Sequence, residues 1–360
     1  MGNASIPATR SSTRVRGIDS IRFLCAVVVM LGHIGFLHSE PHGVGKPALI
    51  KMLIGIYNSL FNGHAAVIVF FVISGFCIHY PFRSGRSPIL TSFYSRRYLR
   101  VLGPALVFYA GMRWIGKDLH SPFDMVLWSV ICEVIYYTLY PALLLLRQRC
   151  SWGLLIAIST TVAIMLFLYR LQYLTHGADS YTVLRWGTWV IGLPCWLLGC
   201  WLAEQYTSFR VCTSHQIWLV RTAIYVLSVL IELLHFHTPL PPASNVFMLN
   251  FFAFAVTAWL GLEIQYAHNH EPSRFLEWAG TWSYSLYLGH VLGPTLLAGT
   301  FVALIYAKPS THFIKLFVAL AFSYGFYRLV EYPSHRLAIF VSRNFDRKKT
   351  EPSNLLAKNA

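Results

Sequence analysis

The first apolar stretch of the sequence carries an arginine and a histidine whose spacing places them on one helix face. Arg22 and His33 are 11 residues apart, which in an α-helix returns to within about 20° of the same direction, roughly 16 Å further along. Asp19 lies one turn before Arg22, near the same stripe. Arg22 and Asp19 are equally well explained as groups at a headgroup boundary. An imidazole deep in such a stretch favours function, which makes His33 the candidate general base or acyl-accepting nucleophile.

A second pair of basic residues opens another apolar stretch. Arg97 and Arg100 are three residues apart, so a helix puts both on one face, one turn from each other. Two planar guanidinium forks at this spacing are suited to binding phosphate oxygens. Anchoring of a membrane helix at its cytoplasmic edge explains arginines here equally well. Spacing alone leaves both interpretations open.

A carboxylate lies in the middle of a third apolar stretch. Glu133 forms a polar stripe at helical spacing with Ser129, Tyr137 and Tyr140. An unpaired carboxylate in such a place is neutral or costly, so Glu133 needs a partner such as His33 or an arginine. The stripe therefore indicates a catalytic carboxylate or a structural pair between helices.

Two stretches near the C-terminus carry further ionisable residues. His290 is interpreted as a hydrogen-bonded interior histidine in a supporting role, with Tyr284 and Tyr287 on the same face. Arg328 and Glu331 are three residues apart and are predicted to pair with each other. The remaining histidines lack the spacing of metal ligands, so no metal site is expected.

The composition sets the environment in which these residues must lie. Hydrophobic residues make up 56% of the 360 residues and charged residues 12%, against about 25% charged in soluble domains. This excludes a soluble globular protein and predicts an integral membrane protein surrounded by lipid. The formal charge of +15 indicates membrane topology and not nucleic acid, because no run of interleaved basic and aromatic residues is present. The seven cysteines form no CxxC motif, which indicates small buried hydrophobes.

The apolar stretches predict an all-α fold with about ten transmembrane helices. They cover residues 17–36, 63–81, 98–116, 123–146, 152–170, 185–205, 216–235, 246–266, 283–306 and 311–332. No internal repeat is visible. We expect one polytopic membrane domain over residues 1–340 and a basic, disordered cytoplasmic tail over 341–360.

The distribution of lysine and arginine predicts the orientation of this ten-helix arrangement. Of the 29 Lys and Arg residues, 20 fall on the side of the two termini, 8 on the opposite side, and Arg328 within the last span. Basic residues accumulate on the cytoplasmic side of membrane proteins. Both termini are therefore predicted to be cytoplasmic.

Taken together, these residues resemble membrane-bound acyltransferase family 3, whose multi-span enzymes O-acylate bacterial cell-surface and exported glycans. The resemblance runs through nearly the whole chain and rests on six motifs in the same order. They are RGIDSIRFLCAVVVMLGH with Arg22 and His33, FFVISGFCI (70–78), Arg97-x-x-Arg100 followed by Pro104, WSVICEVIYYTLYP (128–141), SYSLYLGH (283–290) and EYP (331–333).

The resemblance implies an acyl-CoA donor as co-substrate, acetyl-CoA by family precedent, and no tightly bound cofactor. The acceptor it implies is a hydroxyl of a glycan or lipid-linked sugar, and the location is a bacterial inner membrane. On this interpretation Arg22, Arg97 and Arg100 bind the donor, while His33 carries the transfer and Glu133 orients or charges its imidazole. Asp19, Tyr137 and His290 support them. The alternative is a transporter or flippase of a glycan-linked substrate, whose intramembrane charges serve a transport pathway.

Overall fold

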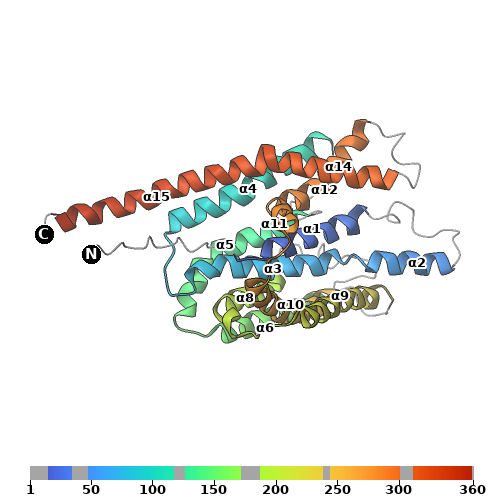
Figure 1. The fold of residues 1–360 in the computed structure, drawn as a ribbon, viewed down its shortest axis with the longest axis horizontal. Helices are drawn as coiled ribbons and strands as arrows, with labels where there is room; N and C mark the ends of the chain where they lie inside the picture. The colour runs from blue at the N-terminus through green and yellow to red at the C-terminus, as the bar shows by residue number, and fades with distance from the viewer. Residues whose placement is uncertain are drawn as a thin grey trace, which may run out of the picture.

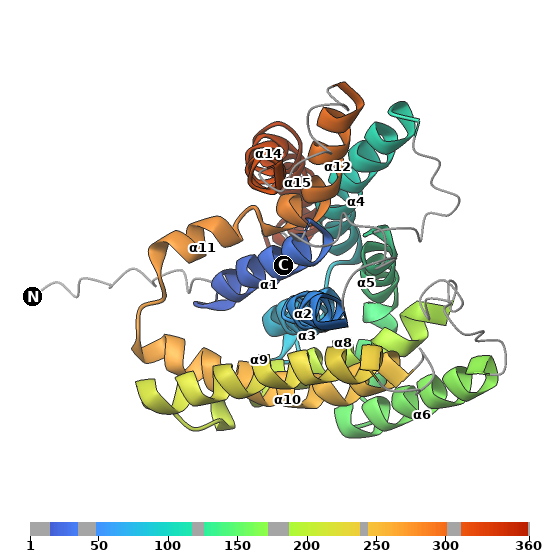
Figure 2. The ribbon, with the colours of Figure 1, turned by 90° about the vertical axis from the view of Figure 1, so that its right-hand side faces the viewer.

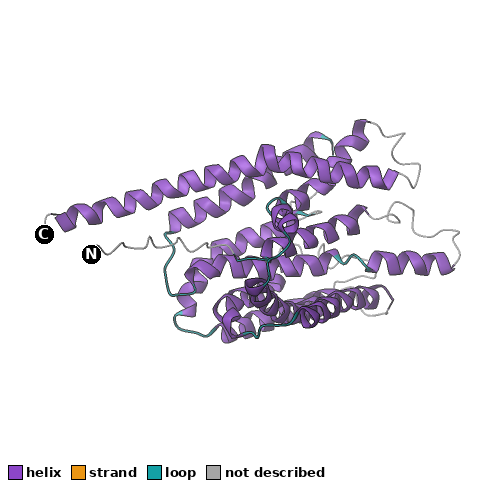
Figure 3. Cartoon of the chain, viewed as in Figure 1, coloured by secondary structure: helices purple, strands orange, loops and turns teal. Residues whose placement is uncertain are grey.

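The computed structural model shows an elongated bundle of helices (Figures 1 and 3). It describes residues 15–34, 48–116, 126–171, 187–237, 244–300 and 311–358, and these contain no β-strand. Its longer helices are α1 (Ile18–Ile34), α2 (Ala48–Ser59), α3 (Gly63–His79), α4 (Leu90–Trp114), α5 (Leu127–Arg147), α6 (Trp152–Leu171), α8 (Thr188–Gln205), α9 (Ser214–His237), α10 (Ser244–Asn269), α12 (Ser283–Thr300), α14 (Thr311–Phe326) and α15 (Tyr332–Lys358). Shorter elements are η1 (Tyr80–Phe82), η3 (Tyr206–Ser208), α11 (Arg274–Gly280) and the π-turn η4 (Tyr327–Glu331).

A helix lies in each of the ten predicted stretches, and this confirms the all-helical membrane fold. Six helical segments among the described residues are long and apolar enough to cross a bilayer. They cover residues 63–82, 127–147, 152–169, 214–234, 248–269 and 313–345. Helix α4 falls short because Arg96, Arg97 and Arg100 lie within it. The total of ten spans and the cytoplasmic termini stay predictions.

Helix α3 forms the centre of the bundle, with α1, α5, α8 and α10 packed around it (Figure 2). It is apolar on all sides, and most of its residues are buried, as expected of a helix surrounded by other helices. Its closest neighbour is α8, because Gly75 and Gly199 let the two backbones touch. A β-carbon at Gly75 would overlap the carbonyl oxygen of Trp196. This contact holds α3 in position, and α3 carries residues of the candidate site.

Helix α11 crosses the bundle and fixes the start of α1. It is seen end-on in Figure 1 and lengthwise in Figure 2. Its Glu277 accepts hydrogen bonds from the Ser20 backbone N–H (3.0 Å) and from Ser20 Oγ (2.6 Å). A carboxylate at a helix N-terminus stabilises the unpaired N–H groups there. Gly280 of α11 meets the Asp19 backbone so closely that a β-carbon would overlap it, and Arg22 one turn later is thereby positioned.

Helices α14 and α15 form one continuous helix through the π-turn η4, and α15 packs along α4 (Figure 1). Pro333 accounts for the π-turn, since it lacks the N–H that would bond the carbonyl of residue 329. Helix α15 continues to Lys358, whereas the sequence predicted a disordered tail from residue 341. Residues 334–351 contain no glycine or proline, and extending an existing helix needs no new nucleation.

Candidate active site

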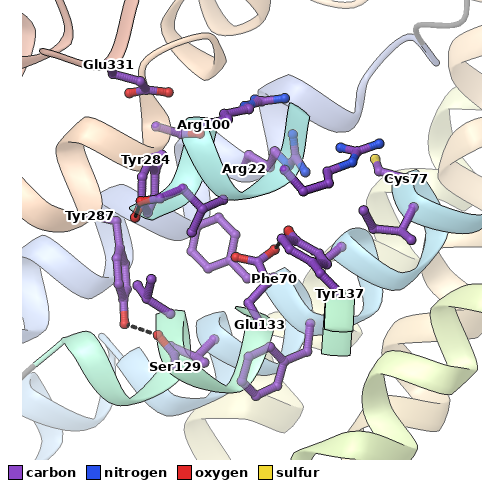
Figure 4. Close-up of a pocket in the computed structure, with 18 of the residues that line it drawn as sticks. Arg22, Phe70, Cys77, Arg100, Ser129, Glu133, Tyr137, Tyr284, Tyr287 and Glu331 are labelled. Carbon is purple, nitrogen blue, oxygen red and sulfur yellow. Dashed lines mark hydrogen bonds between the residues drawn. The ribbon is translucent and has the colours of Figure 1, made fainter. Parts of the chain in front are cut away.

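A cavity of about 110 Å³ lies between α1, α3, α4, α5 and α12 (Figure 4). Figure 4 shows Arg22, Arg100 and Glu331 along one edge and Glu133, Tyr137 and Ser129 along the opposite one. The polar residues that line it are Arg22, Ser74, Cys77, Arg97, Arg100, Ser129, Glu133, Tyr137, Thr281, Ser283, Tyr284, Tyr287 and Glu331. We call it the arginine cavity. It brings together all three predicted donor-binding arginines and two other predicted site residues, Glu133 and Tyr137.

The three arginines reach the cavity from two helices and are only partly buried. Arg22 comes from α1, and its NH1 lies 3.7 Å from Asp19 Oδ1, so the predicted proximity of Asp19 is confirmed. Arg97 and Arg100 come from α4, one turn apart. Within the described part of the chain, neither of these two has a carboxylate within 4 Å. Their forks therefore face the cavity without a protein counter-ion at bonding distance.

Glu133 is held by a chain of hydrogen bonds through Tyr137 and Ser74 to Trp196. Its Oε1 accepts a hydrogen bond from Tyr137 OH. Because that proton is committed to the carboxylate, Ser74 Oγ must donate to Tyr137 OH over 3.3 Å, and Trp196 Nε1 donates to Ser74 Oγ over 3.2 Å. Glu133 thus bonds a tyrosine on its own helix, and the structure does not join it to His33 as the sequence suggested.

Two tyrosines of α12 close the cavity on another side. Tyr287 OH lies 2.6 Å from Ser129 Oγ and 3.0 Å from the Val126 carbonyl oxygen. Tyr284 OH donates to the Val101 carbonyl over 2.9 Å. These bonds tie α12 to α5 and α4, so the cavity walls are cross-linked by hydroxyl groups. Of the stripe predicted on α5, Ser129, Glu133 and Tyr137 line the cavity, whereas Tyr140 does not.

His33 and His290 form a pair further along α1. His290 Nε2 lies 3.2 Å from His33 Nδ1, and the ring centroids are 5.2 Å apart. His290 is 1% exposed, whereas His33 is exposed. Neither residue lines the arginine cavity. Tyr287 connects the two places, since it lines the cavity and its ring lies edge-on to His290 at 6.4 Å.

Glu331 is a site residue that sequence reasoning assigned wrongly. It is 3% exposed, and it accepts a hydrogen bond from the Ser285 backbone N–H over 3.1 Å and another from Ser285 Oγ. Arg328 is exposed and lies over the Tyr332 ring, 5.7 Å from its centroid. The predicted pair between Arg328 and Glu331 is wrong because both residues lie in the π-turn, where residues three apart no longer share a face. The position of Glu331 in the EYP motif (331–333) was the sequence signal that could have identified it as a site residue.

A second polar cluster, which the sequence analysis missed, lies on another wall of the bundle. Glu204 Oε1 accepts hydrogen bonds from Trp152 Nε1 (2.7 Å) and His79 Nε2 (3.0 Å), and its Oε2 accepts one from Arg147 NH2 (2.9 Å). Tyr140 OH donates to His79 Nδ1 over 2.9 Å. We call these five residues the Glu204 cluster. Nothing in their sequence spacing joins them, because they come from four helices.

No group of three or more potential metal ligands lies together among the described residues. The arrangement therefore offers guanidinium groups, hydroxyls, carboxylates and imidazoles. Such groups bind anions and move protons.

Comparison with known families decides the class of protein. Residues 15–328 match the family model described as the acyltransferase domain. The chain belongs to acyltransferase family 3. This acyltransferase has no match among the curated proteins or the solved structures compared with it. The match covers the histidine pair and every residue that lines the arginine cavity except Glu331.

Proposed function

We propose that this acyltransferase moves an acyl group, acetyl by family precedent, from acyl-CoA to a hydroxyl of a cell-surface or exported glycan. The observation that supports this most is the arginine cavity. Three guanidinium groups converge there, and among the residues that the structure describes, two of them have no carboxylate at bonding distance. Arginine forks bind phosphate oxygens in pairs. The nucleotide part of coenzyme A carries several phosphates and is the part of the donor that would use such a site.

The donor must also reach the residue that carries the transfer. Arg22 and His33 lie on the same stripe of α1, roughly 16 Å apart along the helix axis. Coenzyme A has a long, flexible pantetheine arm between its phosphates and its thiol. With the phosphates held at Arg22, Arg97 and Arg100, this arm extends past Tyr287 and delivers the thioester to the histidine pair.

His33 is the proposed catalytic residue. In direct transfer, its imidazole takes the proton of the acceptor hydroxyl while the oxygen attacks the thioester carbonyl. The carbon–sulfur bond then breaks, and the coenzyme A thiolate takes up a proton as it leaves. In the two-step version, the imidazole itself attacks, an acyl-histidine forms, and the acceptor oxygen displaces the imidazole. Both versions give one acyl ester and one free thiol.

In this proposal Glu133 acts in the arginine cavity, where the donor phosphates bind, and not at His33. It lines the cavity beside the arginines and is held by Tyr137. A carboxylate there keeps the guanidinium groups oriented without neutralising them at contact distance, while its bond to Tyr137 fixes its own position. We therefore assign Glu133 to donor placement.

The proposed location is the bacterial inner membrane, with both termini and the arginine cavity on the cytoplasmic side. Cytoplasmic acyl-CoA would enter there, and a glycan or lipid-linked sugar would meet His33 deeper in the membrane or on the far side. The positive-inside distribution of lysine and arginine supports this orientation.

Two measurements test the proposed function. The purified protein is incubated with acetyl-CoA, and thiol release and binding are measured; an acyltransferase of this type binds acetyl-CoA and releases coenzyme A slowly to water. Envelope glycans from cells with and without the gene are then compared by mass spectrometry, and the expected difference is one acyl increment per modified sugar. Absence of acetyl-CoA binding together with unchanged glycans would contradict the proposal and favour a transporter.

A further inference from the structure

The histidine pair contains two imidazoles and two carbonyl oxygens in a geometry that fixes where the protons lie. Each Nδ1 lies 2.9 Å from the carbonyl oxygen four residues earlier: His33 Nδ1 from Val29 and His290 Nδ1 from Leu286. The third contact joins His290 Nε2 to His33 Nδ1 over 3.2 Å. A carbonyl oxygen only accepts hydrogen bonds. The contacts with Val29 and Leu286 therefore need a proton on Nδ1 of each ring.

The proton on His290 Nδ1 determines the role of its other nitrogen. A neutral imidazole has one N–H, so with Nδ1 protonated, Nε2 of His290 is an acceptor. His33 Nδ1–H is then the donor in the contact between the rings, and the same N–H is shared with the Val29 carbonyl. A charged His290 would instead point an Nε2–H at His33 Nδ1, and the Val29 carbonyl would lose its donor. Charge is also disfavoured at a ring that is 1% exposed.

From this geometry we infer that His290 is a positioning residue that holds His33 as its Nδ1–H tautomer, with the reactive lone pair on Nε2. This inference rests on the proposed function of His33. The nitrogen of a histidine that carries the proton is set by the hydrogen bond at the other nitrogen. His33 keeps its Nδ1 proton whether neutral or charged, and the proton or acyl group is exchanged at Nε2.

The pair also stabilises the charge that develops during transfer. When His33 Nε2 takes the acceptor's proton, or forms a bond to the acyl carbon, the ring becomes positive. Its Nδ1–H then donates a charge-assisted hydrogen bond to His290 Nε2, and such bonds are stronger than neutral ones. The stabilisation is larger in the transition state than in the resting enzyme. His290 should therefore affect kcat and not donor binding.

Close packing of α12 against α14 keeps His290 in place. A β-carbon on the preceding Gly289 would come within 2.5 Å of Ser323 Oγ, and one on Gly293 would come within 2.7 Å of the Phe322 side chain. These two glycines let the helices approach closely on both sides of His290. A positioning residue needs such support, because its effect depends on keeping its distance to the catalytic side chain within a few tenths of an ångström.

Two substitutions separate positioning from simple packing. In His290→Phe the ring volume remains but the acceptor is lost, so kcat for coenzyme A release from acetyl-CoA should fall about 10- to 100-fold with KM unchanged, as for lost support of an active-site histidine. In His290→Gln the side-chain oxygen accepts from His33 Nδ1–H, so most of kcat should return. A wild-type kcat in folded His290→Phe, or equal losses in both variants, would overturn the inference.

A spectroscopic measurement tests the same inference without activity. Ring nitrogen-15 chemical shifts of labelled histidine in the full-length protein report which nitrogen is protonated, and the His33 signals are assigned by comparison with His33→Gln. We expect an Nδ1–H form of His33 in the wild type and an increase of the Nε2–H form in His290→Phe. An Nε2–H form in the wild type would overturn the inference. If the wild type neither binds nor cleaves acetyl-CoA, the proposed function fails, and these shifts still decide the tautomer.

Discussion

The arginine cavity and the Glu204 cluster both place charged groups inside an apolar bundle, and they use them differently. In the Glu204 cluster the opposite charges touch: Arg147 NH2 lies 2.9 Å from Glu204 Oε2, and the other oxygen accepts from Trp152 and His79. In the arginine cavity the carboxylates bond hydroxyl groups instead. Glu133 is held by Tyr137 and Glu331 by Ser285.

We propose that this difference is the one between a structural cluster and a binding site. A buried charge is tolerated when a partner compensates it at bonding distance, and the Glu204 cluster meets that condition with protein groups alone. In the cavity, only Arg22 has a carboxylate within 4 Å among the described residues, and that distance is 3.7 Å. Opposite charges are nearby but held apart by a space of about 110 Å³. An anionic ligand is the partner that we propose for this arrangement.

The largest expected contrast is between His33 of the histidine pair and His79 of the Glu204 cluster. His33→Gln should lower coenzyme A release from acetyl-CoA by at least about 10³-fold, because general-base or nucleophilic catalysis is lost, and acetyl-CoA binding should remain. His79→Gln should leave turnover per folded molecule unchanged. Wild-type turnover in His33→Gln would remove His33 from the mechanism.

The arginines give the next contrast. The double change of Arg97 and Arg100 to alanine should weaken acetyl-CoA binding about 100-fold, and Arg100→Lys alone should weaken it about 10-fold because an ammonium group does not replace a planar fork. The matched control is Arg147→Ala, which removes an arginine of the Glu204 cluster and should leave the Kd unchanged. Isothermal titration in detergent measures all three. Unchanged affinity in the folded double variant would make these arginines topology anchors only.

Glu133→Gln should have a smaller effect. The amide oxygen still accepts from Tyr137 OH, but the negative charge beside the arginines is lost, so donor placement should be impaired about 3- to 10-fold in kcat/KM. Tyr137→Phe should give a similar loss by releasing the carboxylate. If the two effects add fully in the double variant, the two residues do not act as one unit.

Glu204→Gln should change stability and not catalysis. It replaces a charged acceptor of three hydrogen bonds with a neutral one that accepts at a single oxygen, which costs about 1–3 kcal/mol. The expected result is a lower melting temperature in detergent, with normal acetyl-CoA binding at low temperature. A loss of acetyl-CoA binding at unchanged melting temperature would show that the cluster is not merely structural.

The sequence predicted the parts of the site that depend on one helix. Arg97 and Arg100 share a face, and Asp19 lies beside Arg22, because helical periodicity alone determines such neighbours. The ten apolar stretches each contain a helix because apolar runs of this length are typical of membrane helices.

The sequence did not predict contacts between distant segments or departures from the regular helix. His33 and His290 are 257 positions apart, and their pairing depends on how α12 packs against α1. The assignment of Arg328 to Glu331 failed because Pro333 forces a π-turn. The polar, basic composition from residue 341 predicts a tail, and α15 runs on to Lys358 in this segment; composition carries no information on whether a preceding helix continues.

We propose above that the arginine cavity binds the phosphates of the donor. The most direct test of this proposal compares the binding of acetyl-CoA with that of S-acetylpantetheine, which lacks every phosphate, to the purified wild-type protein and to the variant with Arg97 and Arg100 changed to alanine. We predict that the wild type binds acetyl-CoA at least about 100-fold more tightly, and that this preference largely disappears in the variant. Equal affinity of the wild type for both compounds, or the same preference in the variant, would contradict the account.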